Sequence, residues 1–117
     1  MIVPRIALAL AADVEERVAR ELERNGYTIV GRCSSADDVV SVLAVTGAEL
    51  ALVCAAPRFL DERLLAASDA AGVRVVAMIA SDSERRHAAS VGLHEVVDAS
   101  ADWSEIEAAL LGSAVAT

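Results

Sequence analysis

Short apolar segments alternate with longer segments of helical period along almost the whole chain. The apolar segments, most of them rich in β-branched residues, are Ile6–Leu10, Tyr27–Cys33, Leu50–Cys54, Val73–Ile79 and Glu95–Val97. The segments of helical period between them are Val14–Asn25, Ala36–Val45, Leu60–Ala71, Ser83–Val91 and Ser104–Leu111. This order predicts five strands, each followed by a helix, and therefore a mainly parallel sheet with helices on both faces.

Residue types at the ends of the predicted helices support these boundaries. Side chains suited to helix N-caps precede the second, fourth and fifth helices, and residues that tolerate a left-handed conformation end the first and third. The expected N-caps are Ser34 or Ser35, Asp82 and Asp102, and the expected helix ends are Asn25-Gly26 and Gly72.

The order of the strands follows from their hydrophobicity and from the connections. The first, third and fourth apolar segments are nearly continuous, which is typical of central parallel strands covered on both faces. Right-handed crossovers and a short first connection favour the order 2-1-3-4-5 of a three-layer, flavodoxin-like α/β domain. We expect one domain over residues 1–112, and residues 113–117 to begin a linker or a tail.

The composition and charge of the chain narrow the classes of function that it could have. Of the 117 residues 56% are apolar but only 3% aromatic, so the core must consist of Ala, Val, Leu and Ile. The net charge of −8 opposes binding to nucleic acid or to anionic membranes. No apolar run reaches the ~18 residues that a membrane span needs. Two cysteines suit a reducing compartment, and we expect a cytoplasmic protein.

A ligand of such a sheet is expected at the carboxyl ends of the strands. The residues at these ends are Leu10–Asp13, Cys54–Pro57, Ile79–Asp82 and Asp98–Ser100. Residues 9–16 contain no glycine and the chain contains no lysine, so a glycine-rich or lysine-bearing phosphate loop is excluded.

The order and lengths of the elements over residues 5–111 resemble the receiver domains of two-component signalling. The turns Ala55-Ala56-Pro57 and Gly92–Glu95 lie where receivers carry similar turns. The resemblance implies a Mg²⁺ site made by an acidic pair after the first strand and an aspartate that ends the third. It also implies a hydroxyl residue after the fourth strand and a lysine after the fifth, which stabilise the transferred phosphoryl group.

All of these implied positions are changed in this chain. The acidic pair is replaced by Ala11 and Ala12, the acceptor by Cys54, the hydroxyl residue by Ile79 and the lysine by Ala99. A shift of one residue recovers only Asp13. We therefore expect a pseudo-receiver that accepts no phosphoryl group and needs no metal or other cofactor.

The segment Ser83–Asp98, together with the altered site, resembles the amino-terminal domain of CpaE/TadZ-type pilus-assembly proteins. In that family an atypical receiver precedes a ParA/MinD-like ATPase and helps to place the protein in the cell. The resemblance implies a non-enzymatic interaction and localisation module, with the ATPase domain missing from this chain, that binds a protein partner or a second copy. Receivers commonly use their fourth helix, fifth strand and fifth helix for contact, which here implies Arg86, His87, Val96, Trp103 and Ile106.

Two alternatives remain open: an atypical response-regulator receiver with displaced acidic residues, and a small-ligand sensor or enzyme that uses the strand-end crevice. Other candidate chemistry has a simpler interpretation. Cys54 is expected in the core rather than as a reactive thiol, and no disulfide with Cys33 is expected, because the predicted strand order places the two cysteines apart. His87 and His94 are expected on the surface. A weak cation site could form from Asp13, Asp61, Asp82 and Asp98, and Trp103 could close the core instead of binding a partner.

Overall fold

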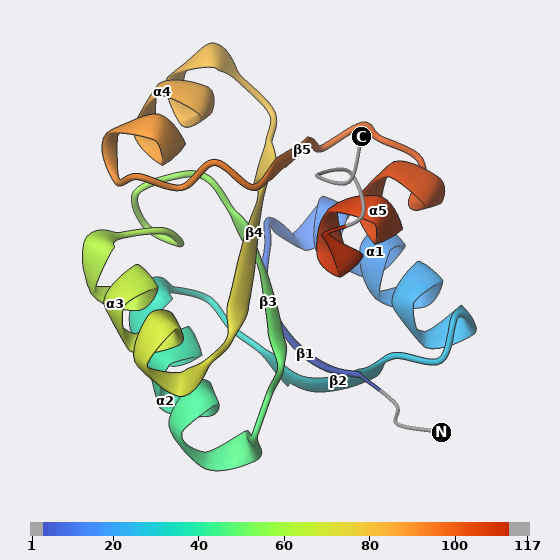
Figure 1. Cartoon of the computed structure of the whole chain (residues 1–117). Helices are drawn as coiled ribbons and strands as arrows, with labels where there is room; N and C mark the ends of the chain where they lie inside the picture. Colours follow the sequence, from blue (N-terminus) through green and yellow to red (C-terminus); the bar gives the residue numbers. More distant parts are fainter. Residues whose placement is uncertain (1–3, 113–117) are drawn as a thin grey trace.

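The computed structural model describes residues 4–112 as a sheet between two layers of helices (Figure 1). The five strands are all parallel and lie in the order β2-β1-β3-β4-β5, which confirms the predicted topology. Their bounds are β1 Arg5–Ala9, β2 Thr28–Arg32, β3 Leu50–Cys54, β4 Arg74–Ile79 and β5 Val96–Asp98. The expected tail, residues 113–117, lies outside the described residues.

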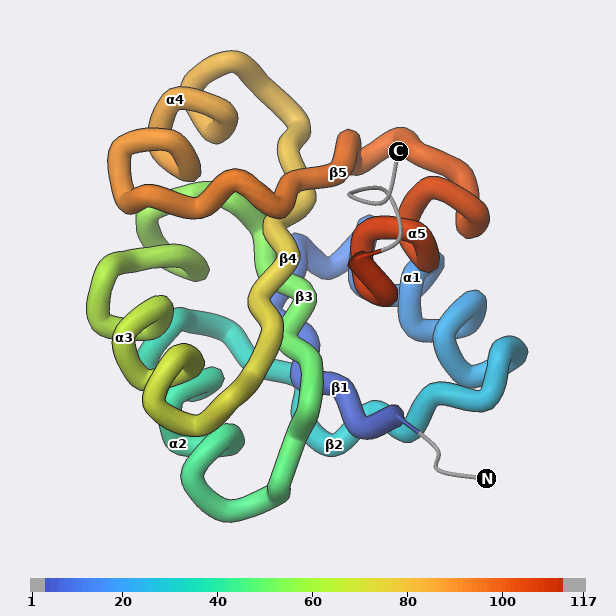
Figure 2. Tube along the Cα trace, viewed as in Figure 1, coloured from blue at the N-terminus to red at the C-terminus, as the bar shows by residue number. Residues whose placement is uncertain are grey.

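The helices alternate with the strands and lie on both faces of the sheet (Figure 2). Helices α1 and α5 cover one face, and α2, α3 and α4 cover the other. Their bounds are α1 Ala12–Arg24, α2 Ala36–Thr46, α3 Glu62–Ala71, α4 Asp82–Ser90 and α5 Trp103–Leu111. Each predicted element is present, with ends that differ from the prediction by up to two residues.

The two edges of the sheet differ from its centre. At one edge β2 pairs with β1 in a register that shifts between Ile6 and Ala7, so that Val30 is an extra residue in β2. The bulge brings Gly31 against α2, where an added Cβ would lie 2.9 Å from a methyl carbon of Val42. At the other edge β5 contains only three residues.

The two faces of the sheet are built from side chains of different size. Large side chains of β1, β3 and β4, such as Leu8, Leu52 and Met78, pack with α1 and α5. Neighbouring positions in the same strands are smaller, such as Ala7, Ala51 and Ala77, and face α2, α3 and α4. The apolar runs therefore contain a period-2 alternation of size rather than of polarity.

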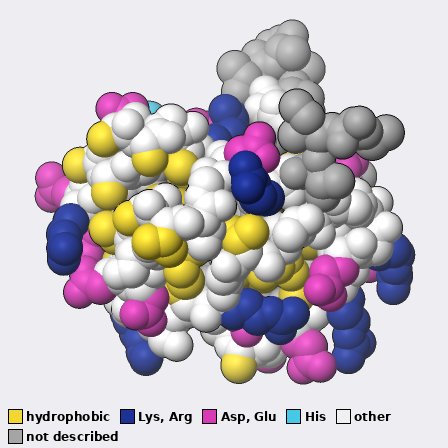
Figure 3. Space-filling model, turned by 90° about the horizontal axis from the view of Figure 1, so that it is seen from below, with side chains coloured by type: hydrophobic (Ala, Val, Ile, Leu, Met, Phe, Trp, Pro, Cys, Tyr) yellow, Lys and Arg dark blue, Asp and Glu magenta, His cyan; other side chains and the backbone are white. Residues whose placement is uncertain are grey.

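Helices α2 and α3 also leave an apolar groove between their exposed sides. The groove is lined by Val40, Leu43, Ala44, Ala67, Ala70 and Ala71. Figure 3 shows hydrophobic side chains gathered on the side of the molecule where α2 and α3 lie.

Side-chain caps fix the starts of four helices, with one difference from the sequence prediction. Ser35, Asp61 and Asp102 cap α2, α3 and α5 by accepting backbone N–H bonds. The prediction that Asp82 caps α4 is wrong, because Ser81 accepts the N–H of Glu84 and Asp82 is already helical. The first helix ends at Asn25-Gly26 as expected, although only the glycine is left-handed.

Candidate functional site

The carboxyl ends of the strands form a crevice that contains a pocket of about 170 Å³. The loops after β1, β4 and β5 contribute to it, together with the ends of β3 and β4 and the first turns of α1 and α4. Its lining is Leu10, Ala11, Asp13, Val14, Cys54, Met78, Ala80, Glu84 and Ala99. Six positions of this chain correspond to the phosphorylation site of receivers or lie next to it in sequence. The structure brings four of them together: Ala11, Asp13, Cys54 and Ala99.

The other two positions lie elsewhere. Ile79 is 3% exposed and belongs to the core on the face of α2, α3 and α4, so Ala80 rather than Ile79 faces the pocket. Ala12 is the exposed first residue of α1 and lines a separate surface pocket with Arg32 and Arg58. Neither position adds a polar group to the crevice.

Glu84 is the polar residue of the crevice that sequence reasoning missed. Its Oε1 accepts the backbone N–H of Ala80 at 2.8 Å, and its Oε2 lies 3.8 Å from the Sγ of Cys54. The carboxylate therefore joins the start of α4 to the end of β3. The signal was present in the sequence, because Ser81 and Glu84 have the spacing of a capping box, in which a glutamate returns to the helix start.

Cys54 occupies the place of the acceptor but has little nucleophilic character. Burial raises the pKa of its thiol, and the Glu84 carboxylate raises that pKa further by its charge and its hydrogen bond. The backbone N–H groups of Ala56 and Ala55 oppose this effect only in part. The thiol is half-buried rather than fully buried, and it is protonated at neutral pH.

The two cysteines are both free and lie in different parts of the core. Cys33 packs on the face of α2 to α4, whereas Cys54 packs against the face of α1 and α5. Burial raises the pKa of the Cys33 thiol too, with smaller contributions from Asp38 and Glu15.

The four aspartates that could have formed a cation site do not gather. Asp61 caps α3, Asp82 lies exposed on α4 and Asp13 lines the crevice. Asp98 accepts the backbone N–H and the hydroxyl of Ser100 at 2.8 and 2.6 Å, and these bonds lower the pKa of its carboxyl. Within residues 4–112 no three His, Cys, Asp or Glu side chains are arranged to hold a metal ion.

The proposed contact residues on α4, β5 and α5 differ widely in exposure. Arg86 is exposed, and Val96 is half-buried. His87 was expected on the surface but is also half-buried, and its Nε2 lies 2.7 Å from the carbonyl oxygen of Leu60. His94 is exposed as expected.

The two apolar candidates on α5 face inwards. Trp103 is half-buried and packs edge-to-face on Tyr27, with 5.7 Å between ring centroids. Ile106 is 1% exposed and belongs to the core, so the expectation that it contacts a partner is wrong. The sequence signal for this burial was the position of Ile106 on the apolar stripe of its helix.

Among residues 4–112, no helix has the length and apolar character that crossing a membrane requires.

Comparison with known proteins agrees with this architecture. No protein-family model matches the sequence, and no curated protein matches it either. Among solved structures, the signal receiver domain of NarL from Mycobacterium tuberculosis matches with a TM-score of 0.79 and 18% identity, covering all of both chains. A LuxR-family two-component response regulator from Aurantimonas sp. SI85-9A1 matches with a TM-score of 0.73 and 22% identity, over 95% of this chain and 87% of that one.

A third similar structure is SdrG from Pseudomonas melonis Fr1 in its BeF3-activated conformation. It has a TM-score of 0.71 and 15% identity, over 97% of this chain and 98% of that one. At such identities the likeness shows the fold and not the activity. This chain has the fold of a response-regulator receiver domain.

Proposed function

We propose that this chain is a receiver-fold interaction module that accepts no phosphoryl group and docks constitutively to a protein partner or to a second copy. The observation that carries the proposal is the composition of the crevice. Ala11, Cys54 and Ala99 line it where a phosphoryl acceptor and its counter-charges would be needed. A thiol held protonated is a poor ligand for Mg²⁺, and the Glu84 carboxylate 3.8 Å from it repels an incoming phosphate.

Glu84 adds a second obstacle to phosphoryl transfer. Its carboxylate places a negative charge in the pocket and uses both oxygens for contacts within the chain. An anionic phosphoryl donor would meet this charge without a lysine to offset it. The contacts of Glu84 therefore favour one fixed position of α4 against β3, rather than two positions that phosphorylation would interconvert.

The exposed side of α4 supports a docking role. This nine-residue helix buries only Ala88, and Arg85 and Arg86 lie exposed on it. By resemblance to CpaE/TadZ-type proteins, we infer that the module helps to position a pilus-assembly ATPase in the cytoplasm. It would supply contact and not catalysis.

The proposal is tested by exposing the protein to acetyl phosphate and Mg²⁺, and separately to beryllofluoride. We expect an unchanged intact mass, unchanged amide NMR spectra and the same sedimentation with and without the reagents. A covalent phosphoryl adduct would refute the proposal. Arg86→Glu tests the docking face: it should lower self-association, whereas Arg20→Glu on α1 should not.

A matched variant shows that the assay can detect transfer. Ala11→Asp, Cys54→Asp and Ala99→Lys together place two carboxylates and an amine around the same pocket, beside the existing Asp13. We expect this triple variant to bind Mg²⁺ more tightly than the parent chain and to gain a phosphoryl adduct.

A second candidate is a response-regulator receiver with displaced acidic residues. One observation favours it: Asp13 lines the same pocket as Cys54. This carboxylate would then be the acceptor, and an adduct abolished by Asp13→Asn would establish that function.

A further inference from the structure

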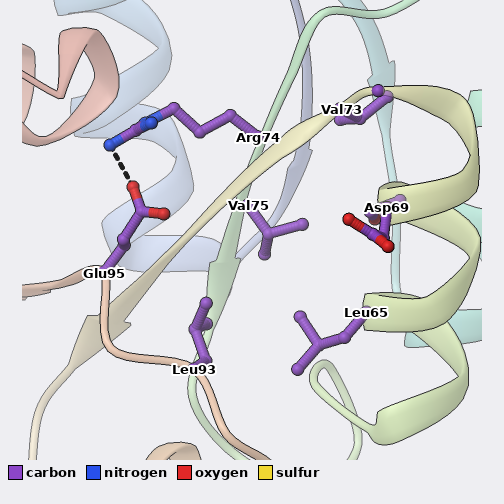
Figure 4. Close-up of a pocket in the computed structure, with 9 residues that line it drawn as sticks. Leu65, Asp69, Val73, Arg74, Val75, Leu93 and Glu95 are labelled. Atoms are coloured by element: carbon purple, nitrogen blue, oxygen red, sulfur yellow. Dashed lines mark ion pairs between the residues drawn. The ribbon is translucent and has the colours of Figure 1, made fainter.

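A second pocket, of about 310 Å³, lies where α3 borders the start of β4 (Figure 4). Four segments form it: helix α3, the turn that follows it, the start of β4, and the connection that leads to β5. Its lining is Leu65, Ser68, Asp69, Gly72, Val73, Arg74, Val75, Leu93 and Glu95. It shares no residue with the crevice, and its volume is in the usual range for small-molecule sites.

The arrangement of the helices explains why this space stays open. Helix α3 packs closely on α2 and β4, whereas α3 and α4 share little contact. The chain then turns into β4 at Gly72, which has a φ of 71° and no side chain to fill the gap. The pocket is therefore a consequence of the fold and not of one loose side chain.

Its floor is apolar. Val73 and Val75 are buried, and Leu65 and Leu93 pack against the same core cluster. In Figure 4 the side chains of Leu65, Val75 and Leu93 converge on the centre of the pocket. Such a floor favours the hydrocarbon part of a ligand.

Ser68 gives the pocket an unused polar group. The residue is 2% exposed, and within residues 4–112 its hydroxyl has no hydrogen-bond partner. A buried hydroxyl without a partner is unfavourable and uncommon in folded proteins. The oxygen itself is enclosed, so a ligand that donates a hydrogen bond to it and removes that penalty must first displace the side chains over it.

Charged groups decide which ligand fits. Figure 4 shows Asp69 and Glu95 extending from opposite sides of the pocket, with Glu95 ion-paired to Arg74. Arg74 also donates a hydrogen bond to the carbonyl of Ala109, at 3.4 Å. No ion pair or side-chain hydrogen bond holds the Asp69 carboxylate within the described part of the chain. One negative charge is therefore left over in the pocket.

We infer that this pocket binds a small aliphatic ammonium ion. The hydrocarbon stem would cover the floor, and the ammonium group would pair with Asp69 and donate to Ser68. An anion would meet uncompensated carboxylate charge, and a bare metal ion would find no cluster of ligating side chains within residues 4–112. The inference concerns a site apart from the crevice, so it stands whether or not the chain accepts a phosphoryl group.

The experiment follows amide NMR shifts during titration with butylammonium and, as a neutral match, with butanol. Weak small ligands bind with a Kd near 1 mM, so the titration extends to about 20 mM. We expect saturable shifts at Ser68, Asp69, Gly72 and Glu95 with the amine only. Equal shifts with butanol, shifts scattered over the acidic surface, or no saturable shift would overturn the inference.

Two variants test the polar contacts. Asp69→Asn should weaken binding roughly two- to fivefold, the range of an exposed ion pair. Asp82→Asn removes the same charge from an exposed position on α4 and should leave the Kd unchanged. An equal loss in both variants would assign the effect to net charge and overturn the site. Ser68→Ala should also weaken binding while leaving the protein folded.

A third probe separates two sources of the same chemistry. N-acetyl-lysine methylamide presents the ammonium group on a peptide-like backbone. Stronger binding of this probe than of butylammonium would indicate a lysine side chain of another protein, and weaker binding a free amine. Either result supports an ammonium site. If neither probe binds, the inference is refuted.

Discussion

The two faces of the sheet carry the same topology but different packing. On the face of α1 and α5, large side chains such as Leu8, Leu52 and Met78 meet Ile106 in a core that opens at the strand-end crevice. On the face of α2, α3 and α4, alanines occupy many of the alternate strand positions, and both the apolar groove and the ammonium pocket lie there. The comparison teaches that two apolar faces of one sheet can differ in side-chain size, while the pockets lie where neighbouring elements separate, as α3 and α4 do.

The largest effect that tests this comparison is expected from Ile106→Ala. Ile106 is fully enclosed, so its truncation leaves a cavity and should lower the free energy of unfolding by about 2–5 kcal/mol. Leu65→Ala is the matched change on the other face, where the side chain already borders a pocket, and should cost less. Urea denaturation measures both. Equal losses would mean that the two faces are packed alike.

A smaller effect is expected when the face with small side chains is overfilled. Ala51 is completely buried in β3, between Ala7 and Val75 of the neighbouring strands. Ala51→Val should cost about 1–3 kcal/mol, because the added methyl groups find no space beneath the helices. Ala44→Val, on the exposed side of α2, serves as the control and should change stability by no more than about 0.5 kcal/mol. A stable Ala51→Val variant would show that this face is loose throughout and not only at its pockets.

The smallest effect concerns the crevice. Glu84→Gln keeps an acceptor for the N–H of Ala80 but removes the charge that disfavours the Cys54 thiolate. The pKa of Cys54 should therefore fall, and at a pH below that pKa the alkylation rate should rise roughly two- to tenfold.

Peptide-level mass spectrometry after timed iodoacetamide treatment gives this rate separately for Cys54 and Cys33. Cys33 is an internal reference, because it lies in the other core cluster and should react as before. A slower reaction at Cys54, or the same change at both cysteines, would contradict the role given to Glu84.

Much of the fold could be predicted from the sequence, because local signals were strong. The bounds predicted for β3, Leu50–Cys54, are those observed, since a continuous apolar run lies between clear helix signals. The start of α4 was less clear, because Ser81 and Asp82 both suit a cap and only the capping-box spacing to Glu84 separates them.

The candidate sites were harder to predict. That Ala11, Cys54 and Ala99 come together followed from the topology, whereas the turn of Ile79 away from the crevice depends on where the strand pleat ends. The ammonium pocket had no sequence signal. It arises from the separation of α3 and α4, which is a property of tertiary packing.

The bulge in β2 and the shortness of β5 have a consequence for how copies of this chain meet. An open sheet edge can recruit a strand from another molecule, and natural proteins prevent this with irregular or very short edge strands. Both edges here have such a feature: Val30 interrupts the ladder on one side, and Val96–Asp98 offers only three residues on the other. Growth of the sheet into a continuous intermolecular ribbon is thus discouraged, and contact through helical surfaces is left as the route to assembly.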